Sequence, residues 1–180
     1  MKTLICVDMQ NDFITGSLAN PVAAAIVKPM VEYIKNFEGD ILFTQDTHYN
    51  CSYLNTQEGK NLPIPHCIVG TKGWDVRDEL KEAAHNAWYY GKARYVQYYT
   101  KNSFGDISEE FVDSESVSEA DEIYLCGTCT DICVISVALN LKARFPEVKM
   151  YCIADLCAGL TPEKHAAALE VMKSCQIEVI

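Results

Sequence analysis

Six short apolar segments are spread along the chain, and each has the length and composition of a β-strand. Most are apolar without interruption, as in Thr3 to Val7 (TLICV) and Ile41 to Thr44 (ILFT). Continuous apolar runs of this length are typical of strands that are buried on both faces, as in a parallel sheet. The six expected strands are Thr3–Val7, Ile41–Thr44, Arg94–Thr100, Glu122–Cys126, Val148–Ile153 and Gln176–Ile180.

Segments with helical spacing lie between these strands. In the first of them, Pro21 to Phe37, apolar side chains recur at the period of one helix face. Near the end of the chain, Thr161 followed by Pro162 has the pattern of an N-cap and a proline at the first helical position. The apolar face of the Pro21–Phe37 segment carries Val22, Ile26, Met30 and Ile34. Further helices are expected over Trp74–Ala84, about Asp131–Phe145, and Pro162 to about Ser174.

The alternation of strands and helices defines the expected fold class. No internal repeat, low-complexity tract or linker interrupts it. We therefore predict an α/β protein, a three-layer α/β/α arrangement around a mostly parallel central sheet of about six strands, with a single domain over residues 1–180. One long irregular segment, Asp46 to Gly73, lies within this pattern, and loops of that length usually carry function.

Charge and composition narrow the class of partner. The 180 residues include 15 Lys and Arg against 25 Asp and Glu, which gives a formal net charge of −10. The basic residues are scattered, whereas nucleic acids and anionic membrane surfaces need basic patches. We therefore expect no nucleic-acid or membrane partner and favour a small-molecule substrate. The sequence is compatible with either a monomer or a homo-oligomer.

The N-terminus and the cysteines indicate the compartment. Met1 to Asp8 lacks the features of a signal peptide, and no apolar stretch approaches the roughly 20 residues of a membrane span. Of the nine cysteines, Cys6, Cys126 and Cys152 lie inside expected strands, where a cysteine behaves as a small hydrophobic residue. We therefore expect reduced thiols in a cytoplasmic protein rather than a disulfide framework.

Titratable side chains follow four of the expected strands, at the point where each strand ends. Asp8 follows the first strand, Asp46 and His48 follow the second, and Lys101 follows the third. The segment Gly127 to Cys133 follows the fourth. Because ligands of parallel α/β sheets bind outside the carboxyl ends of the strands, we expect these groups to lie on one rim.

Two cysteines in the segment GTCTDICV are candidate nucleophiles. Cys133 lies just inside the start of the expected helix, where the helix dipole and free backbone amides can stabilise a thiolate or bind an oxyanion. Cys129 lies in the same turn, so position alone does not decide between them, and a redox or metal-binding pair is the alternative. We favour Cys133. Its activating partners would be Asp8 as base and Lys101 as a stabilising charge, since the histidines lie elsewhere.

The long loop contains candidate metal ligands. Asp46 and His48 are two residues apart, so in extended backbone their side chains point the same way. His66 follows in a proline-rich turn, and Glu58 lies between them. This set suits one divalent ion: we expect zinc, with iron or manganese as alternatives. The competing interpretation is a polar loop with unliganded histidines; His85 and His165, on expected helices, are assigned to structural roles.

The same segments resemble a known family. VDMQNDF (residues 7–13), QDTH (45–48), PHCIVGTKGW (65–74), TKNSFG (100–105) and GTCTDICV (127–134) are similar to those of isochorismatase-like cysteine hydrolases. Within this family they resemble the nicotinamidase branch most. DLCAGLTPEKHAAAL (155–169) resembles the family's closing helix, so the likeness covers nearly the whole chain.

The resemblance implies roles for individual residues. It assigns the catalytic triad to Asp8, Lys101 and Cys133, and an oxyanion hole to the backbone amides of Cys129 and Cys133. It also implies a cis peptide bond between Thr128 and Cys129. The family's metal ligands correspond to Asp46, His48 and His66, with Glu58 as the candidate for the remaining ligand, and Phe13 corresponds to a residue that packs against the substrate ring.

The function that follows is a hypothesis with two rivals. A metal-assisted amidohydrolase would convert nicotinamide to nicotinate and ammonia through a thioester on Cys133, in NAD salvage. A metal-free hydrolase of the same fold, acting on another small amide or ureido compound, is the nearest alternative. A thiol-switch or interaction module without turnover is the alternative from another class.

Overall fold

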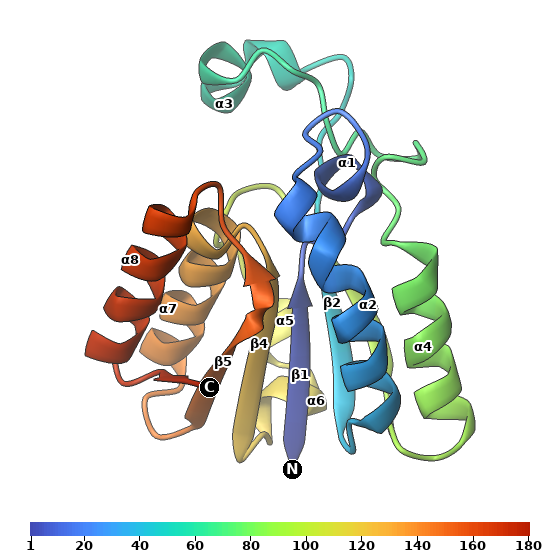
Figure 1. Ribbon diagram of the computed structural model, residues 1–180, viewed down its shortest axis with the longest axis vertical. Coiled ribbons are helices and arrows are strands. Elements are labelled where there is room, and N and C mark those ends of the chain that lie inside the picture. Colours follow the sequence, from blue (N-terminus) through green and yellow to red (C-terminus); the bar gives the residue numbers. More distant parts are fainter.

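The computed structural model describes all residues from 1 to 180 and contains one parallel sheet (Figure 1). The sheet has six strands in the order β3-β2-β1-β4-β5-β6, and every neighbouring pair is parallel. The strands are β1 (Lys2–Val7), β2 (Asp40–Asp46), β3 (Val96–Lys101), β4 (Glu122–Thr128), β5 (Lys149–Ala158) and β6 (Glu178–Val179). The predicted fold class and strand number are confirmed.

Helices connect the strands. The α-helices are α1 (Asn11–Ile14), α2 (Pro21–Asn36), α3 (Gln57–Asn61), α4 (Asp78–Tyr89), α5 (Glu109–Val112), α6 (Glu115–Ser118), α7 (Ile135–Arg144) and α8 (Pro162–Ser174). A 3₁₀-helical turn, η1, spans Tyr53–Asn55, and a π-helical turn, η2, spans Thr130–Val134. None of the helices combines the length and the apolar composition that a membrane-spanning helix needs.

The helices lie on both faces of the sheet, and the central strands are buried between them. Cys6 of β1 lies near Tyr33 of α2, whereas Thr3 donates a hydrogen bond to the carbonyl of Ser116 in α6. Positions 3 and 6 of a strand point to opposite faces, so α2 and α6 cover opposite sides. Every residue of β2 is buried, as expected of a parallel strand covered on both faces.

The strand order places a ligand site at the carboxyl edge. The chain proceeds from β1 outward to β2 and β3, and then returns to add β4 on the other side of β1. The reversal between β1 and β4 is the position where open parallel sheets bind ligands. In Figure 1 the N-terminus lies at the opposite edge, and α1 and α3 lie above the carboxyl ends of the strands.

Several predicted boundaries are wrong. The helix expected from Trp74 begins at Asp78, because Val76 instead forms a β-bridge with Gln10. Val22 is 50% exposed, and Ala23 takes its place in the buried stripe of α2. The third strand begins at Val96 rather than Arg94, the last strand covers only Glu178 and Val179, and the segment 46–73 contains η1 and α3. By contrast, Thr161 caps α8 as predicted: its hydroxyl accepts a hydrogen bond from the Lys164 amide.

Candidate active site

Asp8 lies at the end of β1, beneath the carboxyl edge of the sheet. It is fully buried and has a φ of 51°, a backbone conformation that Asp tolerates better than most residues. The hydroxyl of Thr44, on the neighbouring strand β2, donates a hydrogen bond of 2.7 Å to Asp8 Oδ1. The turn at the strand end and this hydrogen bond hold the carboxylate at the centre of the rim.

Lys101, the last residue of β3, places its ammonium group between Asp8 and Cys133. The side chain is 2% exposed, and Nζ lies 2.8 Å from Asp8 Oδ2 and 3.7 Å from Cys133 Sγ. A second carboxylate, Asp46 Oδ1, is 3.9 Å away. The three side chains that the resemblance assigned to the triad are therefore brought together from β1, β3 and η2.

Cys133 lies in the π-helical turn between β4 and α7. The peptide bond between Thr128 and Cys129 is cis, in agreement with the prediction. The carbonyl of Cys129 accepts hydrogen bonds from the amides of Ile132 and Val134, on either side of Cys133, while the Cys129 amide has no acceptor within the chain. Cys129 and Cys133 line the same cavity, so an unbonded backbone N–H and the thiol come from one short turn, as an oxyanion site requires.

Gly127 allows the turn to sit so close to β1. Its φ is +124°, and a Cβ at this position would lie 2.1 Å from the carbonyl oxygen of Val7. Any larger residue would push the end of β4 away from the end of β1. The distance between the thiol-bearing turn and Asp8 therefore depends on a glycine here.

Burial and charge set the protonation states of these three groups. Burial raises the pKa of the Cys133 thiol well above its usual range, the nearby Asp8 carboxylate raises it further, and the Lys101 ammonium opposes both effects. Burial also raises the pKa of Asp8, against the attraction of Lys101. Burial alone would lower the pKa of Lys101, but the charges of Asp8 and Cys133 outweigh it and raise that pKa. At rest, the cysteine therefore keeps its proton and Lys101 is charged.

Lys101→Met is expected to slow alkylation of Cys133 by iodoacetamide at neutral pH. Removing the ammonium takes away the one neighbouring charge that lowers the pKa of the thiol. We expect a decrease of about tenfold or more, because one pKa unit changes the thiolate fraction tenfold. Rates would be measured by mass spectrometry of the Cys133 peptide, with exposed Cys51 as internal reference. An unchanged rate would leave Lys101 with a structural role only.

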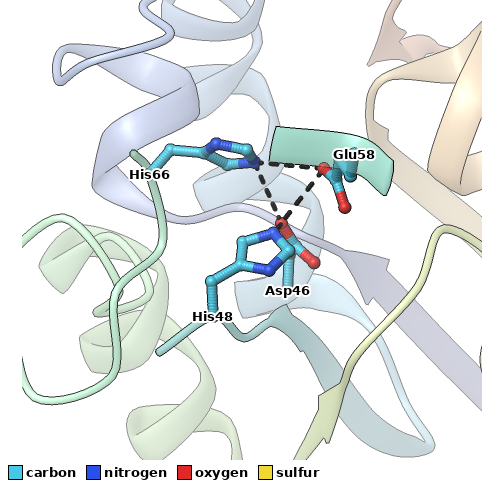
Figure 2. A group of neighbouring side chains, drawn as sticks. All are labelled: Asp46, His48, Glu58 and His66. Atoms are coloured by element: carbon cyan, nitrogen blue, oxygen red, sulfur yellow. Dashed lines mark ion pairs between the residues drawn. The ribbon is translucent and has the colours of Figure 1, made fainter. Parts of the chain in front are cut away.

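Four side chains beside the triad form a second group, drawn in Figure 2. Asp46, His48, Glu58 and His66 each offer one nitrogen or oxygen, and these atoms lie within 4.8 Å of one another. The shorter separations are 3.0 Å and 3.3 Å from Asp46 Oδ2 to Nε2 of His48 and His66, and 3.6 Å from Glu58 Oε1 to each imidazole nitrogen. Donors about 2.0–2.1 Å from a shared tetrahedral ion would be about 3.3 Å apart, so the group fits one divalent metal.

The orientation of the two imidazoles supports this fit. His48 Nε2 is buried and, despite the nearby carboxylates, is not aligned with any hydrogen-bond partner. His66 Nδ1 lies 2.9 Å from the carbonyl oxygen of Ile64. A carbonyl only accepts hydrogen bonds, so Nδ1 carries the proton and Nε2 presents a lone pair to the group. Tyr53 packs against both rings, with centroids at 4.8 Å and 5.2 Å.

The group also attracts a proton strongly. Burial alone would lower the pKa of His48, but the carboxylates of Asp46 and Glu58 outweigh it and raise that pKa to about 9. Burial would likewise raise the pKa of Asp46, yet the two histidines and Lys101 lower it. Buried carboxylates and imidazoles that face one point in this way are able to hold a cation.

A small cavity joins the thiol to the candidate metal ligands. Its volume is about 240 Å³, below the roughly 300–1,000 Å³ of sites for drug-sized ligands. Phe13 of α1 lies in its wall, and its ring packs edge-on against His66 with centroids 5.7 Å apart. The full lining is Phe13, Leu18, Asn20, Asp46, Glu58, Leu62, His66, Phe104, Cys129, Ile132, Cys133 and Leu160. The cavity therefore suits a small, largely apolar ligand with a few polar atoms.

Comparison with known proteins identifies the family. A family model described as the isochorismatase domain matches residues 2–180. The chain belongs to the isochorismatase family. A Bacillus subtilis protein described as an uncharacterized isochorismatase family protein is 30% identical over 182 residues, which cover 93% of this chain and 92% of that protein.

Other relatives in the isochorismatase family carry the names of amidases. The nicotinamidase/pyrazinamidase of Mycobacterium tuberculosis is 29% identical over 188 residues, covering 100% of this chain and 98% of that protein. A crystal structure of nicotinamidase/pyrazinamidase from Bacillus subtilis superposes with a TM-score of 0.79 at 26% identity, covering 99% and 98% of the two chains. A Pyrococcus horikoshii pyrazinamidase in complex with zinc gives a TM-score of 0.74, with the same identity and coverage.

The residues that the sequence singled out divide into two groups in this family member. Cys133, Phe13 and three of the four candidate metal ligands line one cavity. Lys101, Asp8 and His48 lie outside this lining: Lys101 Nζ is 3.7 Å from Cys133 Sγ and 2.8 Å from Asp8, and His48 is 3.0 Å from Asp46. His85 lies on the exposed side of α4, away from the cavity. His165 of α8 lies outside the cavity lining, but its Nδ1 is 2.9 Å from Thr130 Oγ1 in η2.

Several residues that shape the site were not among the predicted site residues. Gln10 is fully buried, and its side-chain amide contacts the backbone of Asp46 from both sides: Nε2 donates to the carbonyl and Oε1 accepts from the amide, each at 2.8 Å. It lies in the segment VDMQNDF, which was the available signal. Leu160 lies in the segment DLCAGLTPEKHAAAL, whereas Leu18 and Leu62 gave no signal, because no motif distinguishes them from core leucines.

Proposed function

We propose that this chain is a cysteine amidohydrolase that converts nicotinamide to nicotinate and ammonia through a thioester on Cys133. The observation that carries the proposal is that one small cavity connects Cys133 of a buried Asp–Lys–Cys arrangement to a group of four side chains that fit a divalent metal. The names of the relatives, nicotinamidase and pyrazinamidase, support the same substrate class.

The triad residues would carry the chemistry in two halves. Asp8 takes the proton of the Cys133 thiol as the sulfur attacks the carboxamide carbon, with the new negative charge on oxygen facing the amides of Cys129 and Cys133. When the carbon–nitrogen bond breaks, Asp8 passes that proton to the leaving nitrogen, which departs as ammonia. Water then attacks the thioester carbon, and Asp8 accepts one of its protons. When the carbon–sulfur bond breaks, Asp8 gives this proton to the sulfur, and the product acid loses its own proton to solvent and leaves as nicotinate.

Lys101 has a supporting role in this scheme. Its ammonium stays charged and lies within 4 Å of both the Asp8 carboxylate and the sulfur. It stabilises the thiolate as that charge develops. It also compensates the charge of Asp8 in a site with almost no solvent exposure.

We propose a zinc ion as the cofactor, held by Asp46, His48, His66 and Glu58, with iron or manganese as alternatives. Imidazole and carboxylate donors suit all three metals, and the Pyrococcus horikoshii relative was solved with zinc. When bound, such an ion supplies a Lewis acid for a ring nitrogen of the substrate. Phe13 packs against the edge of the His66 ring, so it is placed to contact the ring of the substrate.

The cytoplasm is the proposed compartment. All nine cysteines are free thiols. Cys152 and Cys157 are unbonded although their sulfur atoms are 3.7 Å apart. Buried cysteines that serve as small apolar core residues, such as Cys6 and Cys126, are typical of proteins from a reducing compartment.

The direct test is ammonia release from nicotinamide by the purified protein. We expect turnover that is lost after chelation and restored by zinc. A protein that hydrolyses other small amides but not nicotinamide, with or without chelator, would favour the metal-free rival. A protein that hydrolyses none of these amides, but whose cysteines are reversibly oxidised, would favour the thiol switch.

Purified protein is expected to carry about one divalent metal per chain, because one cluster of four donors holds one ion. His48→Ala or His66→Ala should lose most of that metal, and Glu58→Ala should do the same if Glu58 completes the shell. All three should weaken nicotinamide binding more than they slow alkylation of Cys133. Elemental analysis would measure the metal content, and calorimetry would measure nicotinamide binding. His85→Ala, at an exposed position of α4, is the control. The proposal would be contradicted if the purified protein contained no metal and hydrolysed nicotinamide at the same rate with and without chelator.

A further inference from the structure

One peptide group at the rim of the cavity is fixed by side chains from two distant parts of the chain. It joins Gly159 to Leu160, in the connection between β5 and α8. The Gly159 carbonyl accepts a hydrogen bond of 3.0 Å from Asn20 Nδ2, and the Leu160 amide donates one of 2.9 Å to Asp131 Oδ1. Both polar groups of this peptide are thus engaged, so it is not free to turn.

The two side chains that hold it are themselves anchored. Asn20 is the N-cap of α2, and its Oδ1 accepts a hydrogen bond of 2.9 Å from the Val22 amide. Asp131 belongs to η2, two residues before Cys133, and its neighbour Thr130 bonds to His165 of α8. The rim is therefore fastened at once to the start of α2 and to the turn that bears the thiol.

Gly159 makes this close approach sterically feasible. A Cβ at this position would lie 2.7 Å from His165 Cβ and 3.0 Å from Asp131 Oδ1. Real Cβ contacts are longer, so a side chain here would force the loop away from η2. The absence of a side chain lets the backbone itself form the contact.

Leu160 is the residue that this arrangement positions. Its side chain is 51% exposed, yet it lines the cavity together with Cys129 and Cys133. A half-exposed leucine on a free loop would move aside for a larger ligand at little cost. Here, movement of the backbone would break two hydrogen bonds, one of them to a charged acceptor.

We propose that Leu160 is a specificity-determining residue, held by Asn20 and Asp131 so that the cavity admits monocyclic heteroaromatic amides and excludes fused-ring amides. The inference rests on the proposed amidohydrolase function and adds a substrate limit to it. Leu160 and Cys133 line the same cavity, so a ring whose carboxamide is held at the thiol lies beside the Leu160 wall, and a second ring fused on that side has to displace this wall. Asp131 is a positioning residue in this scheme, and Asn20, which also lines the cavity, holds Leu160 in the same way.

The test compares kcat/KM for nicotinamide with kcat/KM for quinoline-3-carboxamide and isoquinoline-4-carboxamide, which carry the second ring on different sides. Leu160→Ala is expected to raise the fused-ring to single-ring ratio by about tenfold or more for at least one of the two, the scale on which apolar walls discriminate by size. Leu54→Ala is the matched control, since Leu54 is 53% exposed and lies outside the cavity.

One isosteric variant tests the positioning of Leu160 by Asn20, and a second serves as its control. Asn20→Asp keeps the oxygen that caps α2 but removes the donor to Gly159, so it should shift the ratio in the same direction as Leu160→Ala, mainly through KM. Asp131→Asn keeps an oxygen acceptor for the Leu160 amide and should retain the wild-type ratio. Alkylation of Cys133, measured in each variant, separates a moved wall from a damaged nucleophile.

The outcomes are distinct. A wild-type protein that releases no ammonia from nicotinamide overturns the proposed function and this inference together. An active wild type whose ratio is unchanged for both fused-ring amides in Leu160→Ala overturns the inference alone. A shift with Leu160→Ala but none with Asn20→Asp overturns the positioning by Asn20.

Discussion

Cys133→Ala is expected to abolish amide hydrolysis while leaving the fold intact. In the proposed mechanism the thioester forms on the Cys133 sulfur, which lies 3.7 Å from the Lys101 ammonium. Loss of a nucleophile in comparable enzymes lowers kcat on the order of 10⁴–10⁶-fold. Exchange of a thiol for a hydrogen at one buried Cβ removes little packing, so thermal unfolding should change only slightly. Ammonia release and a melting curve on the same preparation would measure both.

Cys129→Ala provides the matched control from the same turn. In the proposed mechanism Cys129 contributes its backbone amide, which alanine retains. We expect activity to fall much less than in Cys133→Ala, and the Cys133 peptide alone to carry the acyl group in a quenched reaction. If Cys129 proves to be the essential thiol, the roles within this turn are assigned the wrong way round.

Asp8→Asn is expected to lower turnover by several orders of magnitude while keeping the shape of the site. An amide cannot take the thiol proton, and a positioned general base contributes about 10²–10⁴-fold on its own. The variant also leaves the Lys101 ammonium buried beside a neutral group, 2.8 Å from where its partner charge was. Breaking a buried pair in this way costs about 3–5 kcal/mol, so stability should fall as well.

A double variant separates these two effects. Asp8→Asn combined with Lys101→Met removes both charges, and replacement of both partners is often close to neutral for stability. We expect the double variant to regain much of the melting temperature lost by Asp8→Asn but none of the activity. Recovery of activity along with stability would mean that Asp8 acts only by balancing Lys101.

The position of the site could be predicted from the sequence because parallel strands all end at the same edge of the sheet. Asp8, Asp46 and Lys101 each follow an apolar run, and parallel strands bring such residues to one edge whatever the exact strand order. Asp46 and His48 share a direction because side chains two apart in extended backbone do so. These inferences rest on local geometry that tertiary packing does not change.

The cavity wall could not be predicted in the same way. Leu160 lines the cavity together with Cys133, and the hydrogen bonds of its peptide group with Asn20 and Asp131 join residues far apart in the chain. The limits of α4 were misjudged for a related reason: Val76 pairs with Gln10, which lies 66 positions earlier, instead of joining the helix. Contacts of this kind override local preference and leave no pattern in the adjacent residues.

Asp46 links the two halves of the site more closely than the sequence analysis assumed. Its Oδ2 faces the two imidazoles, whereas Oδ1 is 3.9 Å from the Lys101 ammonium. One carboxylate therefore belongs to the candidate metal group and to the surroundings of the triad. Variants of His48 and His66 test substrate binding more cleanly than variants of Asp46, which would also change the charge around Lys101.

The central place of β1 in the sheet has a consequence for synthesis of the protein. β1 pairs with β2 on one side and with β4 on the other, but β4 begins only at residue 122. Until that segment leaves the ribosome, one edge of β1 stays unpaired in the nascent chain, and the apolar run Leu4–Val7 along that edge is prone to pair with other chains. We therefore expect chains truncated between β3 and β4 to aggregate and to need chaperone protection, while chains that extend through η2 bury that edge.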